Sequence, residues 1–200
     1  MDLQPRGDEP IRAKAEIVET ALAVGHALNA ANERYAISGG AALALMGGTR
    51  PTGDMDVYIP TERRKRIEDL LLRQRGFAKA GPRIQFAAHR NIPKKTGMQG
   101  VMSKLKKTPS PYVDVPLDLN QVAAEAIHTI QIDGVNVLHP RAHLNVKCEH
   151  DRHDKDAKDI KFLAKWMVDN NMPTSRKEIP ECYKYRSGQA ALKAVGAFVQ

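Results

Sequence analysis

The sequence predicts an α/β (α+β) fold, in which a small mixed β-sheet is flanked by helices and followed by a helical C-terminal part. Three observations indicate it. A strand, a glycine turn and a helix follow one another near residue 40, two acids alternate with apolar residues from position 54, and a hairpin signal at Asp133-Gly134 gives way to helical spacing. We expect a main domain over residues 1–170 and a helical extension over 171–200, which packs on it or contacts a partner.

The first elements are predicted by spacing and by glycine. Apolar residues at helical spacing predict a helix within residues 11–32, and residues 35–37 predict a short strand. Ser38, Gly39 and Gly40 then form a tight turn that leads into a helix over residues 41–46. Glycine lets the backbone approach a phosphate closely, and a helix N-terminus presents free N–H groups to an anion.

Two carboxylates follow on the next predicted strand, residues 54–59. The period of two sends Asp54 and Asp56 to one face and leaves apolar Met55 and Val57 on the other. Paired carboxylates suit a hard cation such as Mg²⁺ or Mn²⁺, which proteins hold with few ligands and which substrate phosphates complete. The acids and the glycine turn together predict a nucleotide-phosphate and metal site.

The remaining elements follow in order. Thr61 is expected to cap a helix over residues 62–75, and two strands at residues 77–80 and 83–88 are joined through Gly81-Pro82. Residues 128–132 and 135–138 flank Asp133-Gly134 as a hairpin. Helices then continue to the C-terminus, the last of them over residues 189–199.

The order and spacing of these motifs resemble a known superfamily. Thirteen residues separate Gly40 from Asp54, which is similar to the glycine-glycine, spacer, D-x-D pattern of the nucleotidyltransferase (DNA polymerase beta-like) superfamily. The match is closest to its small single-chain members, the toxin-type and antibiotic-modifying nucleotidyltransferases. An arginine and a threonine commonly precede the first aspartate there, as Arg50 and Thr52 do here.

The resemblance implies a third carboxylate on a later strand next to D-x-D. Asp114, between two valines, matches the apolar-acid-apolar signature of that position, and we assign the role to it. Asp118 is the alternative, but Pro116 is expected to interrupt the strand and to make Asp118 a turn or cap residue.

The resemblance also implies a reaction. A nucleoside triphosphate such as ATP would lie against Ser38, Gly39 and Gly40, with Arg50, Thr52 and Lys147 as further nucleotide contacts. Asp54, Asp56 and Asp114 would hold Mg²⁺ or Mn²⁺ while the nucleotide moves to a hydroxyl acceptor and pyrophosphate leaves. Asp159, in a K-D-x-x-D-like run, is expected to cap or to form a salt bridge.

The distribution of positive charge gives evidence about the acceptor of the nucleotide. The formal net charge is +8, and no Asp or Glu lies between Gly81 and Val113, whereas seven Lys and Arg residues do. This basic segment, residues 83–107, predicts a surface for the triphosphate or for an RNA or tRNA acceptor; the alternative is a solvated loop. A small hydroxylated molecule or a protein side chain would need no such surface.

Two other classes of function fit the same residues. The same groups would serve a phosphotransferase or pyrophosphotransferase, and a non-catalytic nucleic-acid or protein-binding module on the same fold is a third class. No apolar run is long enough to span a bilayer, and the polar start has no signal-peptide apolar region, so we expect a cytoplasmic protein without a membrane partner. The sequence does not indicate an oligomeric state.

Overall fold

The computed structural model describes residues 14–89, 112–149, 154–172 and 174–194. Within these ranges seven strands form one mixed sheet in the order β3-β4-β5-β2-β1-β7-β6. The strands are β1 (Ala36–Ser38), β2 (Met55–Pro60), β3 (Phe77–Ala80), β4 (Arg83–His89), β5 (Tyr112–Val122), β6 (Thr129–Ile132) and β7 (Val135–Leu138). β2 is antiparallel to β1 and parallel to β5, so the sheet is mixed as predicted.

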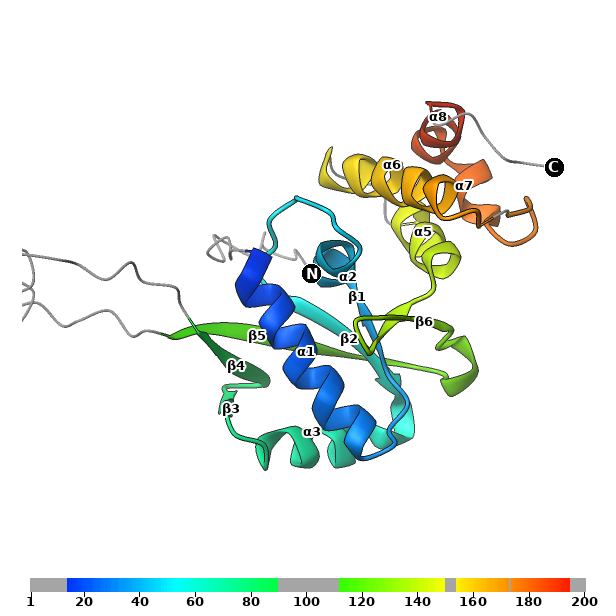
Figure 1. Cartoon of the computed structure of the whole chain (residues 1–200). Helices are drawn as coiled ribbons and strands as arrows, with labels where there is room; N and C mark the ends of the chain where they lie inside the picture. The colour runs from blue at the N-terminus through cyan, green and yellow to red at the C-terminus, as the bar shows by residue number, and fades with distance from the viewer. Residues whose placement is uncertain (1–13, 90–111, 150–153, 173, 195–200) are drawn as a thin grey trace, which may run out of the picture.

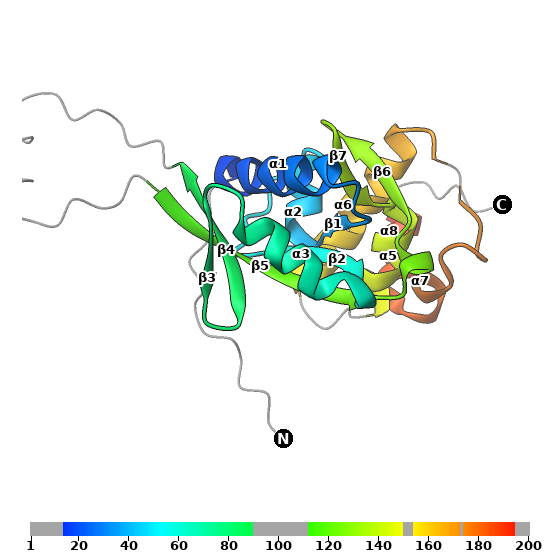
Figure 2. The same cartoon turned by 90° about the horizontal axis from the view of Figure 1, so that it is seen from below.

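Helices cover the sheet and continue beyond it. They are α1 (Lys14–Ala30), α2 (Gly39–Leu45), α3 (Arg64–Leu72) after the short turn η1 (Thr61–Arg63), α5 (Pro140–Glu149), α6 (Asp154–Asp169), α7 (Pro180–Lys184) and α8 (Arg186–Ala194); a further short turn is η2 (Ala124–Ala126). Helix α1 crosses one side of the sheet, and α5 to α8 gather on another side (Figure 1). Figure 2 shows the β3–β4 hairpin at one end of the molecule and the C-terminal helices at the other.

The core lies between the sheet and the helices. In α1 the buried residues repeat every three or four positions, which places one face of the helix on the sheet, as its spacing predicts. In β2 and β5 the buried residues alternate with partly exposed ones, so one face of each strand packs inward. The other face of these two strands is left for polar side chains.

The predicted hairpin between β6 and β7 is confirmed. The hairpin has Asp133 and Gly134 at φ 50° and 75°, which is the left-handed conformation that an Asp-Gly turn supplies. Thr61, however, does not cap a helix: its hydroxyl donates to the Val122 carbonyl oxygen at 3.3 Å, and α3 begins at Arg64.

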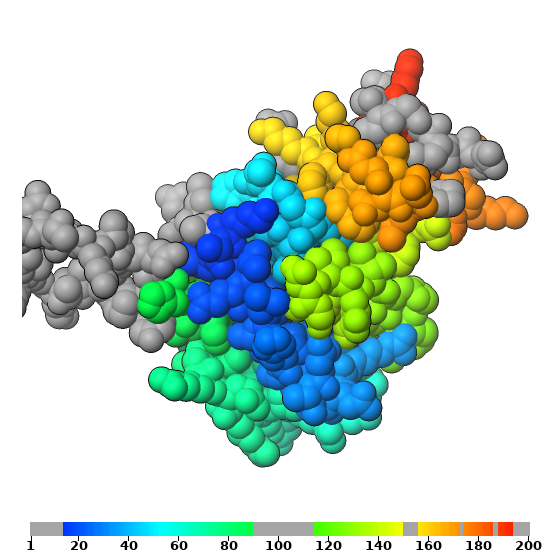
Figure 3. Space-filling view, in the orientation of Figure 1, coloured from blue at the N-terminus to red at the C-terminus, as the bar shows by residue number. Residues whose placement is uncertain are grey.

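The C-terminal helices belong to the same hydrophobic core. Ile179 and Cys182 are buried at the start of α7, and Ala191 and Leu192 are buried in α8, in one cluster with the residues of α1 and the sheet. In the space-filling view the yellow and orange surface of α6 adjoins the cyan surface between α2 and β2 (Figure 3). No helix in the described ranges is long and apolar enough to cross a membrane.

Candidate active site

Asp56 lies at the centre of the polar face of the sheet. Its register partners are Ser38 on β1 and Asp118 on β5. Asn120, two residues further along β5, donates from Nδ2 to Asp56 Oδ1 at 3.0 Å. Three adjacent strands therefore bring a hydroxyl, two carboxylates and an amide to one place.

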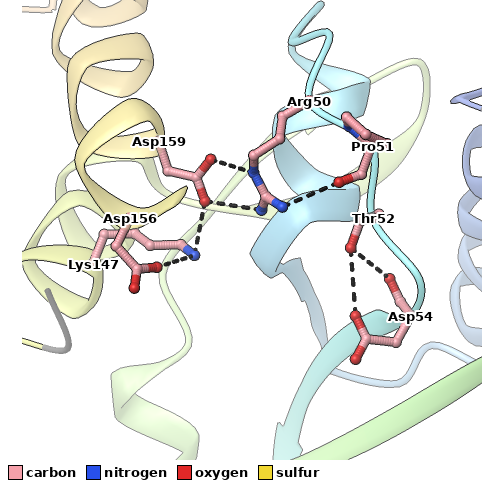
Figure 4. Close-up of polar contacts among 7 residues, drawn as sticks. All are labelled: Arg50, Pro51, Thr52, Asp54, Lys147, Asp156 and Asp159. Atoms are coloured by element: carbon pink, nitrogen blue, oxygen red, sulfur yellow. Dashed lines mark hydrogen bonds and ion pairs between the residues drawn. The ribbon is translucent and has the colours of Figure 1, made fainter. Parts of the chain in front are cut away.

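Asp54 was predicted to lie in the strand, but it lies in a bend one residue before β2 begins. The Thr52 hydroxyl lies 3.4 Å from both the carbonyl oxygen and Oδ1 of Asp54 (Figure 4). Thr52 thus restrains the backbone and the side chain of the first acid.

The two glycines predicted to form a turn are instead the first residues of α2, which begins at Gly39 rather than at residue 41. Both approach side chains of the site rather than open space. Gly39 has φ +60°, and a Cβ atom added there would lie 2.1 Å from Asp56 Oδ2. A Cβ atom on Gly40 would lie 2.6 Å from both Cβ and Oγ1 of Thr52. Glycine at both positions is therefore what allows β1, α2 and the acidic segment to pack together.

The structure places Asp118, and not Asp114, next to Asp56, at the strand position where the third carboxylate was expected. Asp114 is exposed and lies opposite Ala87 of β4, on a part of β5 that does not pair with β2. Pro116 does not interrupt the strand, because β5 pairs there with β4 alone and a one-sided position tolerates a missing N–H group. The strand continues, and its pairing with β2 begins at Leu117.

The environment of Asp56 disfavours its ionised form. Burial raises the pKa of the Asp56 carboxyl, and the negative charges of Asp54 and Asp118 raise it further. The hydrogen bond from Asn120 and the positive charge of Lys147 lower that pKa, but they do not outweigh burial.

This donor set fits a hard divalent cation. Carboxylate oxygens are the ligands that Mg²⁺ and Mn²⁺ prefer, and a cation would relieve the repulsion that raises the pKa of Asp56. Among the described residues no three His, Cys, Asp or Glu side chains form a ready-made metal group. The described carboxylates therefore do not make up a closed protein cage.

Lys147 and Arg50 meet at one buried carboxylate. Arg50 donates from Nε and Nη2 to the two oxygens of Asp159, at 2.6 and 2.9 Å. Lys147 Nζ lies 2.9 Å from Asp159 Oδ2 and 3.2 Å from Asp156 Oδ1. Figure 4 shows this network between α6 and the segment before β2. The predicted salt-bridging role of Asp159 is confirmed.

A cavity of about 320 Å³ adjoins Asp56. Its lining comes from β1, the glycine turn, β2, β5, α5 and α6: Ser38, Gly39, Asp56, Tyr58, Asn120, Val122, His143, Val146, Lys147 and Asp156. Four of the predicted site residues, Ser38, Gly39, Asp56 and Lys147, are thus brought together around one space. The other predicted residues near it, Gly40, Arg50, Thr52 and Asp54, are not part of this lining.

Sequence reasoning missed Asn120 and misjudged Asp118. The signal was present, because Asp118 and Asn120 alternate with apolar Leu117 and Leu119 as Asp54 and Asp56 do with their neighbours. The basic segment could not be followed to the site: residues 90–111 lie outside the described ranges. Its first residue, Arg83, is described, and its Nε lies 3.0 Å from Asp118 Oδ1.

Comparison with solved structures identifies the fold. One similar structure is an antigenic nucleotidyltransferase-like protein from Paracoccidioides brasiliensis. The match covers 93% of this chain and 89% of that protein's chain, with a TM-score of 0.60 and 20% sequence identity. JHP933 from Helicobacter pylori matches 93% and 90% of the two chains at a TM-score of 0.46 and 14% identity. No protein-family model and no curated protein sequence matches the chain.

The first of these neighbours shares the architecture over nearly the whole chain, and the predicted mixed sheet with flanking helices is present. The chain therefore has a nucleotidyltransferase-like fold, as the glycine-glycine and D-x-D pattern indicated.

Replacing Gly39 by Ala tests the close approach at the turn. We expect Gly39→Ala to lower the unfolding midpoint and to displace Asp56, because the new Cβ atom would overlap the carboxylate. Gly134→Ala is the matched control, since Gly134 also has positive φ but nothing within 4 Å of the added atom. Thermal unfolding of both variants measures the difference; equal losses would contradict the packing role of Gly39.

Replacing Asp56 by Asn tests the raised pKa. A carboxyl whose pKa is raised on folding stabilises the native state below its unfolded value of 3.8, and this contribution is lost as the pH rises through the folded value. Without metal, Asp56→Asn should therefore unfold at a higher temperature than the wild type at pH 7, and the gap should close as the pH falls. A lower midpoint for the variant at pH 7 would contradict this reading.

Replacing Asp159 by Asn tests the ion network. The change leaves Lys147 and Arg50, 15% and 26% exposed, without their shared carboxylate. We expect the free energy of unfolding to fall by about 3 kcal/mol, the low end for breaking a buried pair, because Arg50 loses its carboxylate partner while Lys147 keeps Asp156. Asp169→Asn, which removes the exposed partner of Lys165, should cost less than about 1 kcal/mol in the same urea titration. Equal costs would show that the network does not hold the helices.

Proposed function

We propose that the protein is a metal-dependent nucleotidyltransferase, which moves a nucleoside monophosphate from a nucleoside triphosphate to a hydroxyl acceptor and releases pyrophosphate. The observation that carries the proposal is the cluster of Asp56 and Asp118 in register beside the Ser38-Gly39 turn, with Asp54 within electrostatic range. Asp56, the Ser38-Gly39 segment and Lys147 line one cavity, and Asp118 lies beside Asp56 on the next strand. This arrangement suits a phosphate-bearing substrate. The nucleotidyltransferase-like fold supports the same class.

Asp54, Asp56 and Asp118 would hold Mg²⁺ or Mn²⁺. When bound, the ion neutralises charge on the reacting phosphate and favours deprotonation of the attacking hydroxyl. Asn120 keeps Asp56 oriented through its 3.0 Å hydrogen bond, which leaves Asp56 Oδ2 on the side of the glycine turn.

The cavity residues would bind and orient the triphosphate. Gly39 and Ser38 offer a surface that phosphate oxygens can approach, and Lys147 of α5, which pairs with Asp156 and Asp159, supplies a positive charge in the same cavity. Arg50 is assigned a positioning role. Its guanidinium donates to both oxygens of Asp159 and so orients the carboxylate that also pairs with Lys147. Thr52 is also assigned a positioning role, because its hydroxyl contacts the Asp54 carboxylate.

The carboxylate set gives the sharpest test. Each nucleoside triphosphate is titrated into the protein with and without Mg²⁺ by calorimetry, in the wild type and in Asp54→Asn, Asp56→Asn and Asp118→Asn. We expect Mg²⁺-dependent binding that weakens by about 10-fold or more in each variant, because charge-assisted ligands are lost. Asp114→Asn, on the same strand, is the matched control and should bind as the wild type does.

Three other outcomes would change the proposed site or the proposed reaction. Loss of binding in Asp114→Asn but not in Asp118→Asn would restore Asp114 as the third carboxylate. No Mg²⁺-dependent binding of any triphosphate would contradict the enzyme and favour a non-catalytic binding module. Mass spectrometry of a modified acceptor separates the reaction types, since an added phosphate or diphosphate would identify a phosphotransferase or pyrophosphotransferase instead.

A further inference from the structure

His143 of α5 is a buried imidazole in the wall of the cavity beside Asp56. Three polar side chains of that lining are buried, namely Ser38, His143 and Asp156. His143 is 0% exposed, whereas the side chain of Lys147, one helical turn further along α5, is 15% exposed. The imidazole is therefore withdrawn from the water that reaches Lys147.

Among the described residues, none forms a hydrogen bond with the ring nitrogens of His143. Nδ1 and Nε2 are both buried. Asp156, by contrast, pairs with Lys147 at 3.2 Å, and the Ser38 side chain is hydrogen-bonded to Tyr58. A buried polar group without a partner lowers the stability of a fold, and such a group in a native structure indicates a use for it. Of the three buried side chains, His143 is the one whose hydrogen-bonding capacity is left for a ligand.

The surroundings of His143 keep its ring neutral. The pKa of His143 is lowered to about 3, mainly by burial and next by the positive charge of Lys147; Asp159 raises this pKa and Arg50 lowers it. At pH 7 the ring therefore carries one N–H donor and one acceptor nitrogen. The positive charge of Lys147 that disfavours a proton on the ring also favours an anionic oxygen beside it.

A neutral donor supplies what Lys147 offers only in competition. Lys147 Nζ is shared between Asp156 and Asp159, so a phosphate oxygen must compete with two carboxylates for it. The ring N–H of His143 can donate to a phosphate oxygen without separating any ion pair of the described residues. His143 also lines the same cavity as Ser38, where the phosphates of the proposed substrate would lie.

We propose that His143 is a phosphate-binding residue of this site, and that its ring N–H donates a hydrogen bond to an oxygen of the triphosphate. The inference rests on the proposed nucleotidyl transfer and adds to it a residue outside the glycine-glycine and D-x-D pattern. It implies that an apolar residue at position 143 would make the fold more stable and the site weaker, because the ring finds its partner only when the ligand is bound.

Replacing His143 by Leu separates a binding role from a structural one. Leu has a similar volume and no polar atom, so His143→Leu should unfold at a higher temperature than the wild type. Its Mg²⁺-dependent affinity for the triphosphate should fall by about 10-fold or more, because a hydrogen bond to a charged group is lost. Thermal unfolding and calorimetry of the full chain measure the two effects. A lower midpoint with unchanged affinity would show that His143 serves the fold alone.

Two conservative variants keep the test independent of stability. The side-chain amide of Asn lies near the place of Nδ1 and that of Gln near the place of Nε2, so each variant keeps one donor. We expect either His143→Asn or His143→Gln to recover most of the affinity that His143→Leu loses, which identifies the donating nitrogen. An equal loss in all three variants would exclude the hydrogen bond.

Tyr183→Phe is the matched control. The Tyr183 hydroxyl of α7 is also buried without a hydrogen-bond partner among the described residues, but Tyr183 is not part of the cavity lining. Removing this hydroxyl should leave the triphosphate affinity unchanged. A loss as large as that of His143→Leu would show that the effect does not come from the cavity, and the proposal would fail.

The imidazole itself gives a direct readout by NMR. In the chain labelled with ¹⁵N-histidine, the ring signals of His143 are identified among those of the seven histidines by their absence from His143→Leu. With Mg²⁺ present, a non-hydrolysable triphosphate analogue and inorganic tripolyphosphate should both shift the donor nitrogen of a neutral ring. Unchanged signals in a complex that calorimetry detects would overturn the proposal. A shift with the analogue alone would place the contact on the nucleoside and contradict the phosphate role.

Calorimetry of the wild type distinguishes this inference from the function on which it rests. If the triphosphate binds the wild type and His143→Leu equally well, only the role of His143 fails. If no triphosphate binds the wild type, nucleotidyl transfer fails, and the role of His143 fails with it.

Discussion

The packing of the Gly39 backbone against the Asp56 carboxylate is the constraint on which the rest of the site depends. A Cβ atom at position 39 would lie 2.1 Å from Asp56 Oδ2, so the two strands can pair in their observed register only with glycine there. That register sets Ser38 beside Asp56, and the parallel pairing of β2 with β5 then sets Asp118 on the other side. A shift of one residue would turn these side chains into the core.

A second constraint joins the helical part to the sheet. Asp159 of α6 accepts from Arg50, just before the acidic segment, and also pairs with Lys147 of α5. Since Asp159 is almost fully buried, its charge requires both partners. The ion network therefore ties the position of Lys147, which lines the cavity beside Asp56, to the segment that carries Asp54.

The elements closest to the site were the most predictable, because their signals are local. Alternation around Asp56 predicted β2, and the Asp133-Gly134 pair predicted the turn between β6 and β7. Pro116 misled the prediction because the cost of a proline in a strand depends on which neighbours pair with it, and this depends on the sheet. The position of Asp118 next to Asp56 was hidden for the same reason.

The sequence by itself determined the class of fold, the acidic pair and the glycine pair, and it gave Asp159 either a capping or a salt-bridging role. These follow from residue types and short spacings, which report on backbone conformation and on local charge. Only the tertiary structure decided which later acid meets Asp56 and that Arg50 and Lys147 share Asp159. Strand register and helix docking bring together residues as far as 109 positions apart in the sequence, and no local pattern records those contacts.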